Sequence, residues 1–433
     1  MINSKKKEME KKDELLSLIF SHKNVSILSQ GGTGKSTLIT TIKKELEETS
    51  NLSFHITSTT GVSAYLIKGS TIHSYSGLGV IRPTNTIKDI LTKIKKNKQA
   101  MVRITTTDIL VIDEISMLGG SYFEMLNNVF KIIRKNNKPF GGMTVIVTGD
   151  FYQLSPINDT YVFETETWKE MDFHNIHLEN VYRFTDETYK DILSRIRKGK
   201  HTSRDNVELY KRVKAFTELD VDKMEIKPTF LTSKRIDVEE ENREELRKNP
   251  NELVIFPAID EYKEVKEVEK KEVKKEVEDK EKVFDVLSLI ATKNLELKVG
   301  AQVMLLVNIN VEEGLTNGAR GVVVKLCDYV YVKFMSGETI PFERHAFPFE
   351  RDGKVIATRS QFPFCLAYAL TIHKIQGSTL DLAIIDIGNS IFQSHMTYVA
   401  LSRVRSLSGL YIKSFNPHRI TVDQRVSDFY NDK

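Results

Sequence analysis

The chain has 433 residues, 40% of them hydrophobic, and its 63 Lys and Arg residues nearly balance 59 Asp and Glu residues, for a net charge of +4. This length predicts two or three domains with cores of their own, and the small net charge means that any surface for nucleic acid has to be local. Cys327 and Cys365 are too few for a disulfide framework or a thiolate metal cluster, and no apolar run is long enough to span a membrane.

The first residues limit the cellular setting. They mix lysines with acids and lack the apolar core of a secretory signal, so we expect an intracellular protein in a reducing compartment. Nucleus, mitochondrion, bacterial cytoplasm and a viral setting all stay open. His174 and His177 lie three residues apart without a cysteine or carboxylate pattern beside them, so we expect no zinc site.

Helices and strands alternate over the first part of the chain. Apolar spacing predicts a helix over residues 8–20, and β-branched runs predict strands over 25–28, 53–57, 109–112 and 144–147. This alternation is typical of a parallel sheet with helices on both faces. We therefore expect residues 1–185 to form a first α/β lobe.

A glycine-rich segment follows the first predicted strand. Residues 29–37 read Ser-Gln-Gly-Gly-Thr-Gly-Lys-Ser-Thr, which is typical of a phosphate-binding loop in which Lys35 reaches the β and γ oxygens and Ser36 holds Mg²⁺. A flexible turn that opens a helix is the alternative, but the strand before the loop and the helical spacing after it favour phosphate binding. Ser29 stands where the pattern expects glycine. The predicted nucleotide-binding residues are Gly31, Gly32, Thr33, Gly34, Lys35, Ser36 and Thr37.

Polar residues end two later strands of the same lobe. Asp113 and Glu114 end the strand over 109–112, where Asp113 would complete the Mg²⁺ shell with Ser36 and Glu114 would orient or deprotonate the attacking water. Gln153 follows the strand over 144–147, and we expect it to sense the γ-phosphate. Taken alone, two acids also fit a cap and Gln153 also fits an incidental turn; the upstream phosphate loop favours the functional interpretation.

A second α/β series follows. It has predicted strands over 229–231, 364–369 and 383–387 and predicted helices over 187–197, 235–247 and 396–404. We expect a second lobe formed by residues 186–294 and 357–433. Short strand patterns with turns at Asn317-Gly318 and Ser336-Gly337 predict a small β-barrel over 295–356. Residues 260–282 are rich in Lys, Glu and Val, and we expect a solvated helix or a disordered tether there.

Motifs in both halves resemble one family. The segments are 58–61, 71–74, 113–118, 139–142 with 149–154, 297–305, 317–321, 372–380 and 398–405. In this order they resemble the petite-integration-frequency (PIF-one) family of superfamily-one DNA helicases, over about residues 25–429. The family's adenine-reading glutamine has no counterpart within 8–13, and Phe184 stands where a glutamine commonly follows the motif arginine.

The resemblance implies two RecA-like P-loop NTPase lobes with parallel sheets, ATP and Mg²⁺ between them, and an SH3-like β-barrel in the second lobe. It implies a helicase that moves 5′-to-3′ on single-stranded DNA and unwinds duplex junctions, as a monomer, in replication, repair, recombination or telomere maintenance. It makes Arg183 and Arg403 arginine fingers, and we add Gly377 to the nucleotide contacts. The implied DNA contacts are Thr57, Ser58, Thr59, Thr60, His73, His373 and Lys374.

Two further points stay open on the sequence. An insertion near 78–105, with the lysines of 88–98, would form a strand-separating wedge, although a charged helix face in water explains those lysines nearly as well. Two other functions also fit: a nucleotide-dependent DNA-binding or assembly factor that unwinds nothing, and a phosphate-loop ATPase that acts on protein.

Overall fold

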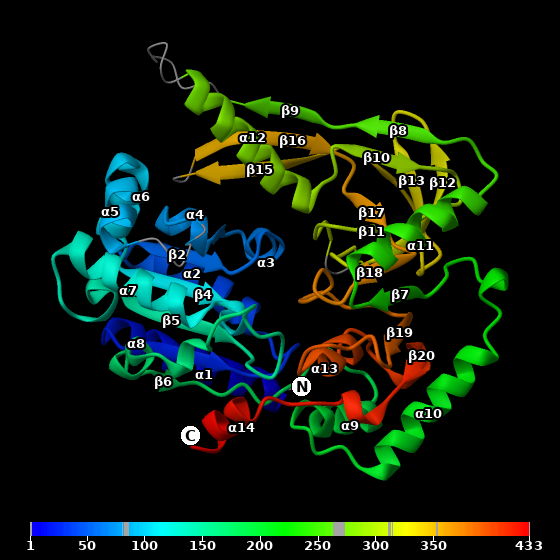
Figure 1. The fold of residues 1–433 in the computed structure, drawn as a ribbon, viewed down its shortest axis with the longest axis horizontal. Coiled ribbons are helices and arrows are strands. Elements are labelled where there is room, and N and C mark those ends of the chain that lie inside the picture. Colours follow the sequence, from blue (N-terminus) through cyan, green and yellow to red (C-terminus); the bar gives the residue numbers. More distant parts are fainter. Residues whose placement is uncertain are drawn as a thin grey trace. The chain divides into compact units, whose positions relative to one another are not determined.

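A computed structural model of the chain describes residues 2–79, 81, 86–262, 273–310, 313, 315–351 and 354–432. The chain forms two compact units, one from Met1–Arg183 with Gln424–Lys433 and one from Phe184–Asp423 (Figure 1). Parts of the predicted wedge (80 and 82–85) and of the Lys-Glu-Val segment (263–272) lie outside the described residues. None of the helices in the described part of the chain combines the length and the apolar character needed to cross a bilayer.

The first unit contains a six-stranded parallel sheet. Its strands are β1 (Val25–Leu28), β2 (Phe54–Ser58), β3 (Ser70–Thr71), β4 (Ile109–Asp113), β5 (Thr144–Gly149) and β6 (His174–Asn175), in the order β3-β2-β4-β5-β1-β6. The four predicted strands are therefore confirmed. The two edge strands have only two residues each, too few to leave an alternating pattern in the sequence.

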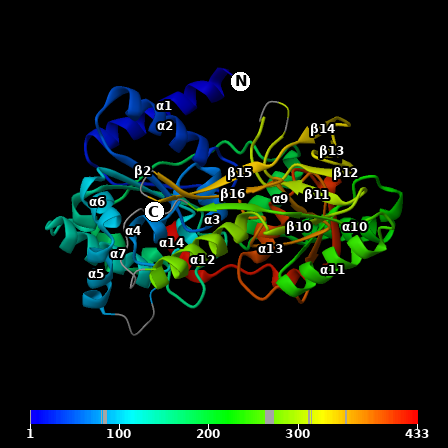
Figure 2. The same ribbon diagram turned by 90° about the horizontal axis from the view of Figure 1, so that it is seen from above.

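Helices cover the sheet of the first unit. They are α1 (Ile2–Phe20), α2 (Lys35–Thr49), α3 (Gly61–Leu66), α4 (Ile72–Ser76), α5 (Ile87–Lys96), α6 (Lys98–Thr106), α7 (Gly120–Arg134), α8 (Glu166–Glu170) and α14 (Gln424–Asn431). α1 and α2 lie together on one side of the sheet (Figure 2), where Ile19 and Ile42 pack with Val111 and Ile146 in one buried cluster. This packing fixes the start of α2, and with it the loop after β1.

The last helix corrects the predicted domain boundary. Residues 357–433 were expected to complete the second lobe, but α14 packs in the first unit. The Phe429 ring stacks on Phe163 with centroids 4.3 Å apart, and the Tyr430 ring stacks on Tyr152 at 4.8 Å. The Tyr430 hydroxyl also accepts a hydrogen bond from the Phe151 N–H at 3.3 Å. Aromatic partners this distant in sequence cannot be identified from local patterns, so the sequence could not assign this helix.

The second unit has a parallel sheet of four strands. They are β7 (Thr229–Thr232), β18 (Ala369–Thr371), β19 (Ala383–Ile387) and β20 (Leu410–Phe415), in the order β18-β7-β19-β20. Its helices are α9 (Glu187–Arg197), α10 (Ser203–Thr217), α11 (Arg235–Lys248) and α13 (Met396–Leu401). The prediction of one strand over 364–369 was wrong, because residues 364–366 belong to an antiparallel sheet and the chain enters the parallel sheet only at Ala369. Between the two strands, the Ala367 carbonyl accepts hydrogen bonds from Thr229 Oγ1 and Gln302 Nε2.

An antiparallel sheet occupies the middle of the second unit. It consists of β11 (Gln302–Leu305), β12 (Arg320–Leu326), β13 (Val330–Phe334), β14 (Thr339–Phe342) and β17 (Phe364–Leu366), in the order β14-β13-β12-β11-β17. The short strands predicted on either side of the turns at Asn317-Gly318 and Ser336-Gly337 are present, and β17 extends the sheet beyond residue 356. SH3-like closure stays a prediction. β8 (Val254–Pro257) pairs separately with β10 (Asn294–Leu297).

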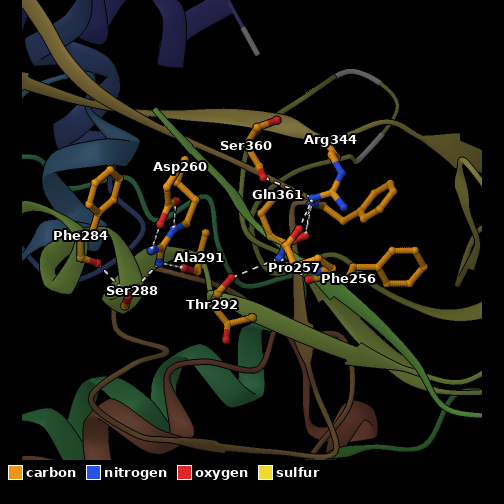
Figure 3. Close-up of polar contacts among 12 residues, drawn as sticks. Phe256, Pro257, Asp260, Phe284, Ser288, Ala291, Thr292, Arg344, Ser360 and Gln361 are labelled. Atoms are coloured by element: carbon orange, nitrogen blue, oxygen red, sulfur yellow. Dashed lines mark hydrogen bonds and ion pairs between the residues drawn. The ribbon is translucent and has the colours of Figure 1, made fainter. Parts of the chain in front are cut away.

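The second unit also contains a sheet of three strands, β9 (Ile259–Tyr262), β15 (His345–Arg351) and β16 (Lys354–Gln361), with α12 (Val273–Ile290) packed on it. A buried arginine on β16 connects this sheet with α12. Arg359 is 1% exposed and donates two hydrogen bonds of 2.7 Å to Asp260 on β9. It also donates to Ser288 on α12 (Figure 3). Asp260, at the start of the Lys-Glu-Val segment, is thus bound by a residue outside the segment.

The described residues also form short 3₁₀ turns. They lie at Ile115–Met117, Pro139–Gly142, Val162–Glu164, Val221–Lys223, Leu407–Gly409 and Pro417–Arg419. The turn at Ile115–Met117 follows β4 directly and therefore shapes the chain next to Asp113 and Glu114.

Candidate active site

The glycine-rich loop lies between β1 and α2 in the first unit. Gly32 and Gly34 have φ angles of 83° and 85°, in the left-handed region that glycine enters without a steric penalty. Gly34 immediately precedes α2, so the unpaired N–H groups of the helix N-terminus face the loop. Lys35 Nζ donates to the carbonyl oxygens of Ser29 at 2.6 Å and Gln30 at 2.9 Å. The lysine is held by the loop itself.

Ser29 has a structural role that a glycine could not fill. Its hydroxyl accepts a hydrogen bond of 3.1 Å from the Leu178 N–H, and its own N–H donates to the Gly149 carbonyl. The side chain therefore connects the start of the loop with the segment after β6. The departure from the loop pattern leaves the carbonyl that holds Lys35 unchanged.

Acidic groups surround the buried ammonium of Lys35. Burial lowers the pKa of Lys35, whereas the charges of Asp150, Glu114 and Asp113 raise it and that of Arg183 lowers it further. Asp150 is fully buried, and its carboxylate accepts a hydrogen bond of 3.2 Å from the Tyr152 N–H. Sequence reasoning did not assign Asp150 to the site. The signal was available, because Asp150 directly follows β5 in the segment that contains Gln153.

The two predicted acids at the end of β4 differ in backbone conformation and in contacts. Asp113 is buried, and its carboxylate accepts a short hydrogen bond from the Thr148 hydroxyl on the neighbouring strand β5. Burial raises the pKa of Asp113 above its ordinary value. Glu114 has a φ of 54°, so the chain turns sharply there, and its carbonyl accepts a hydrogen bond from Thr59. A serine hydroxyl with an aspartate carboxylate supplies the oxygen ligands that Mg²⁺ prefers, so Ser36 and Asp113 fit this ion.

Arg183 and Gln153 lie against the loop glycines. A Cβ atom built on Gly31 would lie 3.0 Å from Arg183 Nη1 and 3.5 Å from Gln153 Nε2. One built on Gly32 would lie 2.5 Å from the Cβ of Arg183, closer than real Cβ atoms approach another heavy atom. Gly32, which also has a positive φ, therefore has to be glycine. The Arg183 guanidinium is at the loop within the same unit.

Tyr182 is a neighbour of the loop that the sequence did not single out. Its N–H donates to the Gly32 carbonyl at 2.8 Å. Its ring is 52% exposed and would lie 3.9 Å from a Cβ atom built on Gly34. An exposed aromatic face beside a phosphate loop is suited to contact a nucleotide base. The tyrosine immediately before the motif arginine was the available signal.

Arg403 and Gly377 belong to the second unit. Arg403 is fully buried, and its guanidinium donates to the carbonyl oxygens of Val399 at 2.8 Å and Ser378 at 3.4 Å. Its Nη2 also donates to the Ser402 hydroxyl at 2.8 Å. Gly377 has a φ of 86° and turns the chain that leads to Ser378. The arginine is thus bonded to the segment that carries the predicted motif 372–380.

The predicted DNA contacts at the end of β2 separate into two groups. Thr57 and Ser58 are fully buried, and their hydroxyls donate to the carbonyl oxygens of Val111 at 2.6 Å and Asp113 at 3.4 Å. These two hydroxyls therefore join β2 to β4. A role of Thr57 and Ser58 in DNA binding stays a prediction. Thr59 and Thr60 are only half-buried, and Thr60 caps α3 by accepting a hydrogen bond from the Ser63 N–H.

The remaining predicted DNA contacts differ in exposure. The His73 ring on α4 packs against Tyr122 with centroids 4.4 Å apart, and burial lowers its pKa. Burial also lowers the pKa of His373 in the second unit. Lys374 beside it is exposed. A lowered pKa favours the neutral form of both imidazoles at physiological pH. A neutral ring can pack or stack, but it brings no charge to phosphate.

Comparisons with known proteins agree on one family. A family model described as PIF1-like helicase matches residues 11–207, and one described as the 2B domain of DNA helicase Pif1 matches residues 286–326. The ATP-dependent DNA helicase Pif1 of Bdellovibrio bacteriovorus is 34% identical over 421 residues, which are 96% of this chain and 90% of that protein. The ATP-dependent DNA helicase PIF1 of Danio rerio is 33% identical over 425 residues, but this chain spans only 62% of its length.

Two solved structures of Bacteroides Pif1 share the fold. The complex with ADP-AlF4 has a TM-score of 0.80 at 26% identity and covers 98% of this chain and 96% of that chain. The structure bound to single-stranded DNA has a TM-score of 0.64 at 25% identity with the same coverage. This likeness confirms the predicted α/β fold with two RecA-like lobes. By sequence and by structure, the chain belongs to the family of PIF1-like helicases.

Proposed function

We propose that this protein is an ATP-dependent DNA helicase that moves 5′-to-3′ along single-stranded DNA and unwinds duplex at junctions. The observation that carries the proposal is the group around Lys35. A half-buried lysine, three acids and Arg183 act on one another at a glycine loop within one unit. This is the set of charges that phosphoryl transfer requires, because such catalysis depends on alignment and charge stabilisation. Family membership supports the DNA substrate.

The proposed chemistry begins with an exchange of hydrogen bonds at Lys35. On ATP binding, Lys35 Nζ leaves the carbonyl oxygens of Ser29 and Gln30 for the β and γ oxygens of the triphosphate. The loop N–H groups bind the same phosphates, with contacts from Thr33 and Thr37. Bound Mg²⁺, held by Ser36 and Asp113, would neutralise charge that develops on the phosphate oxygens. Glu114 then orients the attacking water and accepts its proton.

Three further groups act on the nucleotide in this proposal. Gln153 and the guanidinium of Arg183 lie beside the loop glycines and contact the γ-phosphate. A guanidinium suits this position because it stays charged and offers a planar pair of donors to oxygens that gain charge. The exposed ring of Tyr182 stacks on the base. This contact serves in place of the glutamine that residues 8–13 lack.

Residues of the second unit complete the proposed cycle. Arg403 and Gly377 act on the outer phosphate of the same nucleotide, and loss of the γ-phosphate on hydrolysis releases them. ATP then favours one arrangement of the lobes and ADP another. Each turnover therefore changes the affinity of each lobe for DNA. Alternation of these affinities would move the protein along one strand.

The proposed DNA contacts are the predicted residues that are at least partly exposed. They are Thr59, Thr60, His73, His373 and Lys374. Hydroxyls and backbone amides suit phosphate contacts that ignore sequence, and neutral imidazole rings suit stacking on bases. Bacteroides Pif1, which shares the fold, has been crystallised bound to single-stranded DNA, which supports the choice of ligand. We also propose an SH3-like role for the antiparallel sheet, a wedge near 78–105, and a monomer.

ATP turnover with and without single-stranded DNA tests this function. We expect strong stimulation by DNA, and unwinding of duplexes with a 5′ tail but not of those with a 3′ tail. Nucleotide-dependent DNA binding without unwinding would instead indicate an assembly factor. Turnover that ignores DNA would indicate an ATPase acting on protein. Unwinding from 3′ tails alone would reverse the direction, and parallel assays with GTP would measure the preference for adenine.

A further inference from the structure

A short segment of the second unit lies between Arg403 and a glycine turn of the antiparallel sheet. On one side, the Ser378 carbonyl accepts a hydrogen bond of 3.4 Å from the Arg403 guanidinium, and the Leu380 N–H donates to the Arg403 carbonyl at 2.8 Å. On the other side, a Cβ atom built on Gly318 would lie 2.7 Å from the Thr379 carbonyl oxygen. Residues 378–380 are therefore in contact with both neighbours.

The turn at Gly318 is hydrogen-bonded to its own sheet. Gly318 has a φ of 97°, and its N–H donates to the Leu305 carbonyl at the end of β11 at 2.9 Å. The Leu305 N–H in turn donates to the Ala319 carbonyl at 2.8 Å. Next along the chain, the buried Arg320 donates to the Lys227 carbonyl at 2.8 Å, just before β7. The turn is thus anchored to two sheets of the unit.

We propose that the turn 316–319 is a positioning element for Arg403. The turn supports residues 378–380 from behind, and these residues hold the guanidinium by the Ser378 carbonyl. When the guanidinium leaves the Ser378 carbonyl, the turn limits how far residues 378–380 can move. The turn thereby determines the position that the guanidinium reaches. Gly318 does not touch the nucleotide in this scheme and acts through Arg403. The inference rests on the proposed function, because the action of Arg403 is measured as ATP turnover.

The sheet offers a matched control for a substitution at Gly318. Gly337, in the turn between β13 and β14, has a φ of 90°, but a Cβ atom there would meet nothing within 4 Å. Gly318→Ala and Gly337→Ala therefore both place a side chain at a positive φ, and only the first pushes against the Thr379 carbonyl. The difference between the two variants isolates the contact.

The first test compares the two variants in ATP turnover with saturating oligo-dT. We expect Gly318→Ala to lower kcat about tenfold while KM for ATP and the midpoint of thermal unfolding match those of Gly337→Ala, as for a group that acts in the transition state. Equal kcat values for the two variants would overturn the inference. A lower kcat accompanied by a higher KM for ATP and a lower midpoint of thermal unfolding would also overturn it, because that pattern belongs to a merely structural role.

A double-mutant cycle with Arg403→Lys tests whether Gly318 acts through the arginine. When two residues act as a unit, the double substitution lowers kcat by less than the product of the two single effects. We therefore expect Gly318→Ala to change kcat less than about twofold in the Arg403→Lys background. A full tenfold loss in that background would assign Gly318 an independent role.

Hydrogen exchange on the unaltered protein keeps the inference testable if a variant fails to fold. On addition of ADP-aluminium fluoride with Mg²⁺, we expect protection of peptides covering 316–320 and 378–381 to change together, while the turn at 335–338 does not change. A response confined to the glycine loop of the first unit would overturn the inference alone. Equal ATP turnover by the unaltered protein and Lys35→Ala would overturn the proposed function, and this inference with it.

Discussion

The two compact units treat a buried cation in different ways. In the first unit, Lys35 donates to loop carbonyl oxygens and also lies in the field of Asp150, Glu114 and Asp113. In the second, Arg403 donates to carbonyl oxygens and to the Ser402 hydroxyl. Both cations donate hydrogen bonds to backbone carbonyl oxygens next to glycine turns. The pKa of Lys35, however, is set mainly by burial and by the nearby acids.

The difference follows from the chemistry of the two side chains. A buried ammonium loses its proton readily, so Lys35 needs nearby negative charge to remain a cation that can bind phosphate. A guanidinium stays protonated in proteins, so Arg403 can be fully buried on neutral acceptors and still be charged when it is released. The lysine site is therefore sensitive to pH and to its acids, whereas the arginine site is sensitive to the position of the backbone that holds it.

Removal of the lysine should have the largest effect. Lys35→Ala should lower ATP turnover at least about 10³-fold, because it removes the main cation at the developing charge. The thermal unfolding midpoint should change little, since the lysine now bonds only to loop carbonyl oxygens. Lys44→Ala, at an exposed position on the same helix α2, is the control and should keep normal turnover. Substantial residual turnover in Lys35→Ala would mean that the loop does not bind the reacting phosphates.

Removal of one acid should reveal the pH sensitivity of the lysine site. The charged form of Lys35 is the active form, and Asp150 raises its pKa against the effect of burial. Asp150→Asn should therefore lower the pKa of Lys35. The alkaline limb of the kcat/KM profile should then shift to lower pH, because Lys35 loses its proton earlier as the pH rises. We also expect turnover at neutral pH to fall about 50-fold, as for partners that orient a catalytic group. Profiles are compared after each is normalised to its own maximum, and an unmoved alkaline limb would contradict the assignment.

Loss of the hydrogen bond to Asp113 should have a smaller effect. Thr148→Val removes the hydroxyl that lowers the pKa of this buried carboxylate, so the pKa rises and the acidic limb of the profile moves to higher pH. We expect kcat to fall about tenfold, and a higher Mg²⁺ concentration to be needed for half-maximal turnover. Thr144→Val, at another buried position on β5, is the control. Equal Mg²⁺ dependence in the two variants would contradict a role for Asp113 in holding the ion.

Much of the fold could be predicted from sequence because its strands are local apolar runs. β1, β4 and β5 were placed within two residues, since each is a buried β-branched segment followed by a polar turn. The sequence could not assign α14, because its aromatic partners come from residues far away in the chain. It also merged β17 with β18, because an apolar run carries no mark where the chain passes from one sheet to another.

The site was predicted where a motif joins residue type to position. Lys35, Asp113 and Gln153 follow strands in the expected order, and the structure gathers them within one unit. Asp150 was missed although it directly follows β5, because its burial and its charge interaction with Lys35 appear only in the folded chain. The burial of Thr57 and Ser58 likewise appears only in the folded chain, because their hydroxyls donate across to β4 and only the strand pairing shows this.

The smallest effect should come from restoring the loop pattern at Ser29. Ser29→Gly removes the acceptor of the Leu178 N–H and adds a flexible residue, so the free energy of unfolding should fall by about 1.5 kcal/mol in urea titrations. Turnover at saturating ATP should stay within about twofold, because the carbonyl that holds Lys35 belongs to the backbone and is kept. Ser29→Ala loses the same hydrogen bond without the added flexibility, and should lie between the two proteins. A gain in turnover on changing Ser29 to glycine would mean that the serine limits catalysis, and that the lysine site depends on side chains of its own loop as well as on the surrounding acids.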